Sequence, residues 1–291
     1  MSSARVLRAL LADGRCVVAP GAFDPYSARI IEHLGFSAVY IGGNAIGLQL
    51  CAGQPFVTMT ETVDAVRRIN RAVNVPVLVD AGAGFGDAAH TLVTVRELER
   101  AGAAAIHIDD QVYPKRAHYH RGRGRLLNAA QVTGKLLAAI DGRRDPDFMV
   151  IARTDALRVT ASLDETITRI GHYAQAGIDA AMVLDLGIEM APRVRKALPD
   201  LPLIWIGGIS EPVPSVTELN AAGFCMAVYP FNTVAAVTES VMATWQGLLT
   251  TGRPAKQSCP ATQSVQTALS LVGIAEFWDI ERKTTEPDPE A

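Results

Sequence analysis

The sequence predicts a TIM (β/α)8 barrel, and three observations lead to that prediction. Short apolar runs rich in β-branched residues recur along the 291 residues, and a helical stretch follows nearly every run. The runs lack polar alternation, which is typical of parallel strands buried on both faces. The chain length also suits one α/β barrel. A doubly wound sheet is the structural rival, but it normally needs fewer strands.

The expected elements follow in chain order after an amphipathic N-terminal helix. The predicted strands are 17–19, 38–41, 77–80, 105–108, 149–152, 180–184, 203–206 and 225–229. The predicted helices are 26–34, 60–70, 89–101, 129–139, 162–176, 190–197, 213–222 and 233–249, and Ala-Gly pairs close several of them. We expect a barrel domain over residues 1–252, followed over 253–291 by a helical extension and a frayed tail.

Composition excludes several classes of protein. Apolar residues make up 49% of the chain, so a large core can form. The formal net charge is −3 with dispersed basic residues, which argues against a nucleic-acid partner. The scattered cysteines Cys16, Cys51, Cys225 and Cys259 form no CxxC pair, which indicates reduced thiols. With neither a signal-peptide pattern nor a membrane-spanning run, we expect a cytoplasmic protein without a membrane partner.

Polar residues and glycines gather at the predicted carboxyl ends of the strands, where TIM barrels carry their chemistry. Asp80 and Asp109 end neighbouring strands, and one or two carboxylates suit Mg²⁺, with Mn²⁺ as the alternative. Arg153 can bind a substrate carboxylate through its forked guanidinium. The backbone amides of residues 42–44 (Gly42, Gly43 and Asn44) can receive an anionic oxygen. Together these groups would stabilise an enolate.

Each of these residues also has a structural interpretation. Asp80 could be the N-cap of the next helix, and Arg153 could form an internal ion pair with Asp155 at the barrel rim. The glycines could serve only as turn residues. The basic segment 115–125 is either a solvated surface loop or a lid over an acidic substrate. His107 is interpreted as non-functional.

Four segments together resemble the isocitrate lyase/phosphoenolpyruvate mutase superfamily over residues 5–252. They read GAFDPYSARIIEHLGFSAVYIGG, VPVLVDAGAGFGDA, ELERAGAAAIHIDDQVYPKR and IARTDA. The order IDDQ…PKR followed by IARTD resembles the lyase branch, which holds the methylisocitrate and dimethylmalate lyases. The resemblance implies a TIM barrel, Mg²⁺, a small carboxylate substrate and an enolate-like intermediate. It also implies a homo-oligomer, a dimer of dimers whose C-terminal helices are exchanged between subunits.

The resemblance also implies roles for individual residues. Asp80 matches the direct metal ligand, and Asp109 matches the acid that holds the metal through water. Arg153 matches the arginine that binds the substrate carboxylate. The remaining matches are Tyr40, Gly42 and Gly43 at the keto-acid end and Lys115 at the start of the catalytic loop.

The chain departs from the family pattern at several positions, among them Asp109, where the family usually has Glu. Gly82 replaces a second acid after the third strand, and Ala117 replaces the loop cysteine that acts as a general acid. Gly42 stands where lyases commonly have Ser, and Gly207 stands about where an Asn is expected. Without the thiol, the proton donor would come from the loop residues His118, Tyr119 or His120. The sequence therefore argues against isocitrate or methylisocitrate lyase activity.

The leading hypothesis is a Mg²⁺-dependent carbon–carbon lyase or decarboxylase that acts on a small 2-hydroxy or 2-oxo dicarboxylate through an enolate. Two alternatives stay open at this point. One is phosphorus–carbon bond chemistry of the phosphonopyruvate hydrolase or phosphoenolpyruvate mutase kind. The other is a non-catalytic, ligand-binding barrel, since the joint loss of the acid at position 82, the loop cysteine at 117 and the Asn at 207 is compatible with a decayed site.

Overall fold

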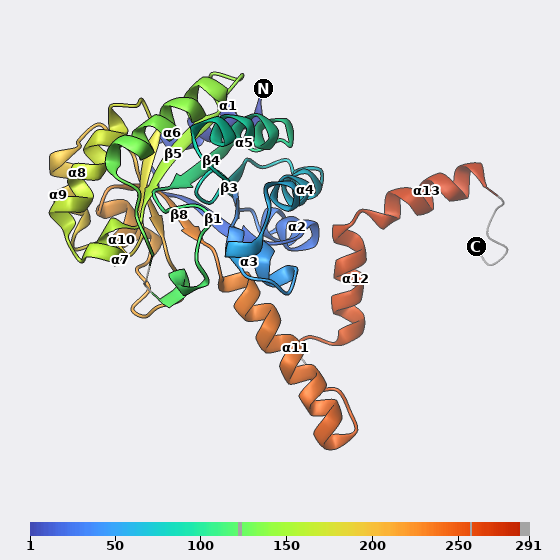
Figure 1. Ribbon diagram of the computed structural model, residues 1–291. Coiled ribbons are helices and arrows are strands. Elements are labelled where there is room, and N and C mark those ends of the chain that lie inside the picture. The colour runs from blue at the N-terminus through green and yellow to red at the C-terminus, as the bar shows by residue number, and fades with distance from the viewer. Residues whose placement is uncertain (122–123, 257, 286–291) are drawn as a thin grey trace. The chain divides into compact units, whose positions relative to one another are not determined.

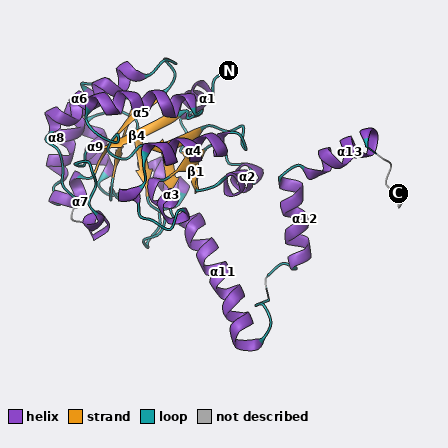
Figure 2. Cartoon of the chain, turned by 45° about the vertical axis from the view of Figure 1, so that its right-hand side comes forward, coloured by secondary structure: helices purple, strands orange, loops and turns teal. Residues whose placement is uncertain are grey.

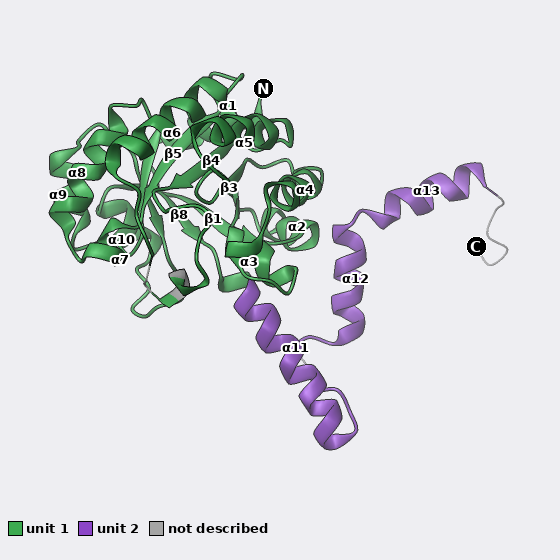
Figure 3. Cartoon of the chain, in the orientation of Figure 1, with its two compact units in different colours: residues 1–233 green, residues 234–291 purple. Residues whose placement is uncertain are grey.

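A computed structural model of the chain describes residues 1–121, 124–256 and 258–285, except for the side chains of Tyr119 and His120. The chain forms two compact units, Met1–Thr233 and Val234–Ala291 (Figure 3). The division near residue 252 that the sequence suggests stays a prediction. In the described ranges, none of the helices combines the length and the hydropathy needed to cross a bilayer.

The strands of the first unit close into a parallel barrel in sequential order (Figure 1). They are β1 (Val17–Ala22), β2 (Val39–Ile41), β3 (Val77–Asp80), β4 (Ala105–Asp109), β5 (Met149–Thr154), β6 (Ala180–Val183), β7 (Leu203–Ile206) and β8 (Phe224–Tyr229). β1 pairs with both β2 and β8, which closes the sheet without a free edge. The predicted TIM barrel is therefore confirmed.

Helices surround these strands (Figure 2). Those expected from the sequence are α1 (Ser3–Ala12), α2 (Pro25–His33), α4 (Met59–Asn70), α5 (Ala88–Arg100), α6 (Ala129–Gly142), α8 (Leu163–Ala174), α9 (Ala191–Ala197) and α10 (Val216–Ala221). Short elements not expected are α3 (Gly43–Gln49), η1 (Gln54–Phe56), η2 (Ala117–Arg121) and α7 (Ala156–Thr160). α10 begins later than predicted because Ser215 forms its capping box, just after Pro214.

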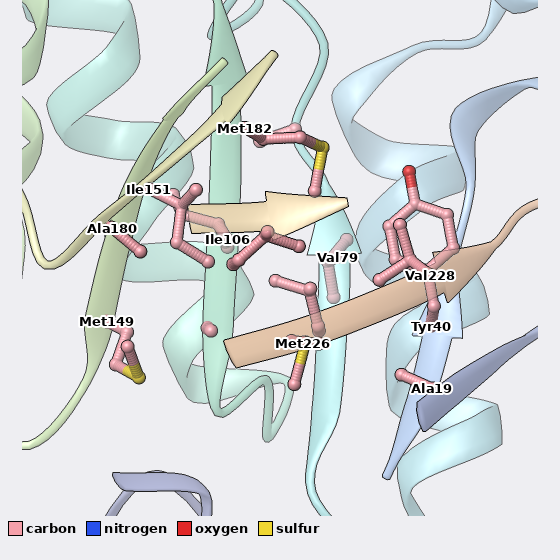
Figure 4. Packing of buried hydrophobic residues seen from close by; sticks show 14 of the residues in the cluster. Ala19, Tyr40, Val79, Ile106, Met149, Ile151, Ala180, Met182, Met226 and Val228 are labelled. Carbon is pink, nitrogen blue, oxygen red and sulfur yellow. The ribbon is translucent and has the colours of Figure 1, made fainter. Parts of the chain in front are cut away.

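The core explains why the strand sequences do not alternate. Every residue of β3, β4, β5 and β6 is buried, since one strand face points into the barrel and the other packs against helices. Figure 4 shows aliphatic side chains such as Val79, Ile106 and Met226 filling the interior. The barrel is thus a packed core, and a ligand can enter only at its ends.

The second unit contains α12 (Ala261–Leu271), α13 (Ile274–Thr284) and all of α11 (Asn232–Thr251) from Val234 onward. No side chain of these three helices is buried in the described part of the chain. Large apolar side chains are exposed on them, including Trp245, Phe277 and Trp278. Such a run of exposed apolar side chains is typical of a surface that another chain covers.

Candidate active site

Asp80, the last residue of β3, is buried and held by three donors. Its Oδ2 accepts hydrogen bonds from the Gly43 amide at 3.2 Å and from Gln54 Nε2 at 2.9 Å. Its Oδ1 accepts from the Gly82 amide at 2.8 Å. The interpretation of Asp80 as a helix cap is wrong, because Asp87 caps α5 instead.

The surroundings of Asp80 favour its ionised form. Burial by itself would raise the pKa of Asp80, but it is outweighed by His107, which is protonated in the acidic range where Asp80 titrates, by the charges of Lys115 and Arg153, and by the Gly82 amide. The net effect lowers the pKa of Asp80 well below its ordinary value. The end of β3 therefore presents a fixed negative charge at neutral pH.

Asp109 and Lys115 form a buried ion pair beside Asp80. The Lys115 ammonium contacts Asp109 Oδ2, and both side chains are almost fully buried. Asp109 Oδ1 accepts a hydrogen bond from the backbone amide of Gln111 at 3.3 Å. The backbone amide of Asp109 donates to the Gly82 carbonyl at 2.8 Å, which joins the ends of β3 and β4. A Cβ at Gly82 would lie 4.0 Å from Lys115 Nζ. An acid at position 82 would therefore neighbour the ammonium of Lys115.

Tyr40 and His107 form a second buried pair next to Asp80. The Tyr40 hydroxyl and His107 Nε2 share a hydrogen bond of 2.9 Å, and the two rings stack. His107 Nδ1 has no hydrogen-bond partner among the described residues and lies 3.9 Å from Asp80 Oδ1. Burial lowers the pKa of His107 to about 4, so the imidazole is neutral at pH 7. Pairing of β3 with β4 aligns Asp80 with His107.

Arg153, on β5, is oriented by a carboxylate. Its Nε and Nη2 donate to Asp155 Oδ1 and Oδ2 at 2.9 and 3.3 Å, and Gln111 Nε2 also donates to Asp155. The ion pair suggested by the sequence therefore exists. It does not withdraw Arg153 from the site, because Arg153 also lines the main cavity.

Asp110 belongs to a separate network that joins β4 to β5 and α8. Its carboxylate accepts from Thr154 Oγ1 at 2.6 Å, from the Tyr173 hydroxyl at 3.0 Å and from the Asp155 amide at 3.0 Å. Burial raises the pKa of Asp110. The contacts indicate a structural role for Asp110.

A cavity of about 670 Å³ opens at the carboxyl ends of the strands. Five of the predicted site residues line it: Tyr40, Gly42, Asn44, Asp80 and Arg153. Gly43 is not among the lining residues and donates its amide to Asp80 instead. A second cavity of about 20 Å³ is lined by Gly43, Gln54, Asp80, Gly82 and Lys115, among others. That volume is enough for one water molecule or a small ion.

The segment after Lys115 is closed at its base, and its described side chains at 116–118 and 121 are exposed. The Val112 amide donates to the Arg125 carbonyl at 2.8 Å, and Gln111 pairs with Leu126 in an antiparallel bridge. His118 is exposed on η2 and does not line the main cavity. The side chains of Tyr119 and His120 lie outside the described residues. Of the two predicted catalytic residues whose side chains the structure describes, Lys115 lies beside the carboxylates and His118 is exposed.

The oxygen atoms near Asp80 suit a hard divalent cation. Among the residues the structure describes, no group of three or more His, Cys, Asp or Glu side chains could hold a metal ion. Mg²⁺ needs fewer, because it commonly takes one or two carboxylates and completes its shell with water and substrate oxygens. Gln54 Oε1 is buried without a partner in the described part of the chain and can serve a metal-bound water. The donor set therefore fits Mg²⁺.

Buried, oppositely charged side chains at the carboxyl ends of a closed parallel barrel, facing one cavity, define an active site of the TIM-barrel class. Comparison with known proteins then places the chain more narrowly. The family model described as phosphoenolpyruvate phosphomutase matches residues 7–249. The chain belongs to this family, within the phosphoenolpyruvate mutase/isocitrate lyase superfamily.

Curated relatives resemble the chain over most of their length. A 2,3-dimethylmalate lyase of Eubacterium barkeri is 38% identical over 85% of this chain and 86% of its own. An oxaloacetate decarboxylase of Rhodopseudomonas palustris is 36% identical, with 87% and 86% covered. A 2-methylisocitrate lyase of Aeropyrum pernix is 37% identical, with 78% and 74% covered. Lyases and a decarboxylase are thus among its relatives.

Solved structures share the fold. The phosphoenolpyruvate phosphomutase of Streptomyces platensis subsp. rosaceus superimposes with a TM-score of 0.89 at 31% identity, covering 97% of this chain and 99% of its own. A phosphonopyruvate hydrolase, solved in complex with oxalate and Mg²⁺, has a TM-score of 0.87 at 24% identity, with 98% and 100% covered. The second likeness concerns the fold alone.

Proposed function

We propose that this protein is a Mg²⁺-dependent carbon–carbon lyase that cleaves a small 2-hydroxy or 2-oxo dicarboxylate through an enolate. The observation that carries the proposal is an ionised, buried Asp80 that faces the same cavity as Arg153. The lyase and decarboxylase relatives support the reaction class. Their reactions differ in the bond broken, but each leaves an electron pair beside a carboxylate or keto group.

Arg153 binds one substrate carboxylate, and the strand-end backbone of β2 receives the neighbouring oxygen. The guanidinium of Arg153 is fixed by Asp155, so little conformational freedom is lost when a substrate binds. Gly42 has no side chain, and a Cβ added at this position would lie 3.2 Å from Tyr40 Cε1. Its backbone, with that of Asn44, is therefore accessible to a substrate oxygen from the cavity.

Asp80 and Asp109 would hold the Mg²⁺ ion, and Gln54 Oε1 would accept from one of its water ligands. When bound, the ion would stabilise negative charge on the oxygens of the substrate and of the enolate. The Lys115 ammonium, paired with Asp109, keeps the acidic cluster from accumulating unbalanced charge. Mn²⁺, with similar ligand preferences, is the alternative ion.

For a 2-hydroxy substrate, the C2–C3 bond breaks as the hydroxyl loses its proton, and C2 becomes the keto carbon of the first product. The electron pair of the broken bond forms the enolate of the second product, which then takes a proton at C3. Tyr40 lines the cavity, and its hydroxyl can accept the proton of the substrate hydroxyl while passing its own to neutral His107 Nε2. For a 2-oxo substrate, CO₂ leaves and the same kind of enolate results.

Lys115 is the first candidate for the donor that protonates the enolate, because it is a buried ammonium beside the carboxylates. His118, Tyr119 and His120 are the further candidates in the loop. Phosphorus–carbon bond chemistry is not favoured, since the two lyases and the decarboxylase, at 36–38% identity, are more similar to this chain than the phosphoenolpyruvate phosphomutase, at 31%. A non-catalytic barrel is not favoured either, because the buried charged groups are costly to keep without a function.

The second unit supports an oligomer. Its exposed Trp245, Phe277 and Trp278 would be covered if the C-terminal helices were exchanged between subunits, as in a dimer of dimers. The free cysteines found among the described residues are compatible with a reducing cytoplasm. Sedimentation of the full chain would measure the oligomeric state.

The test is a panel of 2-hydroxy and 2-oxo dicarboxylates, including 2,3-dimethylmalate and oxaloacetate, assayed for pyruvate with Mg²⁺ and with EDTA. We expect turnover of at least one member, abolished by EDTA and restored by added Mg²⁺. Release of phosphate from phosphonopyruvate, with no turnover of any dicarboxylate, would overturn the proposal.

A further inference from the structure

The cavity has a second half, formed by the segments after β6, β7 and β8, that the proposed reaction does not use. Apolar side chains dominate this half: Leu184, Leu186, Ile188, Trp205, Ile206 and Phe231. The whole cavity, about 670 Å³, falls within the range of about 300–1,000 Å³ found for pockets that bind drug-sized ligands. A four-carbon dicarboxylate bound at Asp80 and Arg153 would leave most of it unfilled.

Gly207 and Gly208 leave room for two aromatic side chains in this half. A Cβ at Gly207 would lie 2.6 Å from Trp205 Cζ2, and a Cβ at Gly208 would lie 2.4 Å from Tyr229 Cδ1. The two rings pack edge to face with centroids 5.3 Å apart. Any side chain at position 207 would therefore displace the indole of Trp205. A polar residue at this position and the observed place of the indole exclude each other.

The charged groups of this half already have partners or are acidic. Arg158 donates to both carboxylate oxygens of Asp185 at 2.6 Å, and Glu218 accepts from the Ser215 amide and hydroxyl at 2.7 Å. Glu189 adds a further acid to the lining. Asp185 adopts a left-handed φ of 65°, so its backbone is strained to present this pair at the rim. A distal carboxylate would be repelled here, whereas an uncharged apolar group would not.

We infer that the β6–β8 half of the cavity binds an apolar substituent of the substrate. The preferred substrates are then alkyl- or aryl-substituted 2-hydroxy dicarboxylates that are bulkier than dimethylmalate. This inference rests on the proposed function for the position of the carboxylate end. The apolar group lies against Trp205 and leaves the polar groups at Asp80 and Arg153 to bind the part of the molecule that reacts.

The test uses 2-substituted succinates, which lack the hydroxyl and are not cleaved. Succinate, methylsuccinate, butylsuccinate and benzylsuccinate are titrated calorimetrically into the full-length protein in Mg²⁺ buffer. We expect the Kd to fall about 3- to 4-fold for each methylene buried, and benzylsuccinate to bind at least about 30-fold more tightly than succinate. A Kd that is flat or rises along the series overturns the inference, and so does absence of binding by every member.

A cavity-filling variant locates the effect. Ile188→Trp should weaken benzylsuccinate at least about 10-fold and change succinate less than about 2-fold, since the added ring occupies the apolar half. The matched control is Val93→Trp on α5, where Val93 is 46% exposed and outside the cavity lining. A benzyl preference that survives Ile188→Trp overturns the inference.

Trp205→Phe gives a second reading that does not add volume. The smaller phenyl ring still packs against Tyr229 but removes part of the apolar lining of the cavity. The variant should therefore reduce the preference for benzylsuccinate several-fold. Failure of the inference and failure of the proposed function are distinguishable. Tight binding of substituted succinates without cleavage of any substituted malate would refute the lyase activity alone, whereas cleavage of small dicarboxylates without a substituent effect would refute the inference alone.

Discussion

The two halves of the barrel mouth differ in how their side chains are held. In the β2–β5 half, Asp80 and Arg153 are buried and fixed by several hydrogen bonds. In the β6–β8 half, the lining is largely apolar, and Ile209 at its rim is 58% exposed. Under the proposed function, the fixed charges of the β2–β5 half would perform the chemistry, and the apolar lining of the β6–β8 half would select the substrate.

The largest expected effect is at Asp80. Asp80→Asn removes the ionised carboxylate while nearly conserving side-chain volume, so kcat/KM should fall by about 1,000-fold or more. The assay is pyruvate release from the best substrate of the panel. The control is Asp87→Asn, the exposed cap of α5, which should leave both stability and turnover nearly unchanged, because Asn and Asp are equally good N-caps. A substantially active Asp80→Asn enzyme would place the chemistry outside the β2–β5 half.

The next effect concerns the Asp109–Lys115 pair. Lys115→Met leaves a buried carboxylate without its ammonium, and should lower the free energy of unfolding by about 3–5 kcal/mol. Urea denaturation would measure this change. The double variant Lys115→Met/Asp109→Asn should recover much of the loss, because no unpaired charge remains. Independent, additive losses would show that the two side chains do not interact in solution.

His107 gives a pH-dependent effect of similar or smaller size. Its pKa is about 4 in the folded state against an ordinary 6.5, so the unfolded state binds more protons between these values. Stability should therefore decrease as the pH falls from 6.5 to 4, by up to about 3 kcal/mol from this residue. Comparison of denaturation midpoints for wild type and His107→Gln over this range checks the sign. An equal pH dependence in the two proteins would exclude His107 as its source.

The smallest expected effect is that of a substitution at Gly207, in the apolar half of the cavity. Gly207→Ala pushes a Cβ against Trp205, and should cost about 1–3 kcal/mol and alter the order of preference among substituted substrates. The matched control is Gly134→Ala in α6, where nothing lies within 4 Å of the added Cβ. That variant should be neutral or slightly stabilising. Thermal denaturation and the substrate panel together distinguish the two glycines.

The sequence predicted the polar half of the site better than the apolar half, for a physical reason. Asp80, Asp109 and Arg153 lie at strand ends, and parallel strands in a barrel bring their carboxyl ends together whatever the details of packing. Trp205 and His107 lie inside strands that are buried on both faces, so no alternation reveals which way their side chains point.

The sequence did not predict the position of Gln54 beside Asp80, for a different reason. It lies in η1, a single short turn after α3, and only the folded chain brings its amide to Asp80. The direction of a side chain in such a connection depends on tertiary contacts rather than on periodicity. The barrel strands and the longer helices between them, in contrast, are predicted to within a few residues, since each strand is a distinct apolar run bounded by turn residues; the short elements α3, η1, η2 and α7 are not.

Under the proposed function, the ionised carboxylate centre at the end of β3 holds a divalent ion for an enolate-like ligand. Calorimetric titration of oxalate, which mimics the planar enolate of a 2-oxo acid, tests it most directly. Oxalate should bind to the wild-type protein only when Mg²⁺ is present, and Asp80→Asn should lose that binding. Equal binding of oxalate with and without Mg²⁺, or unchanged Mg²⁺-dependent binding in Asp80→Asn, would contradict the account.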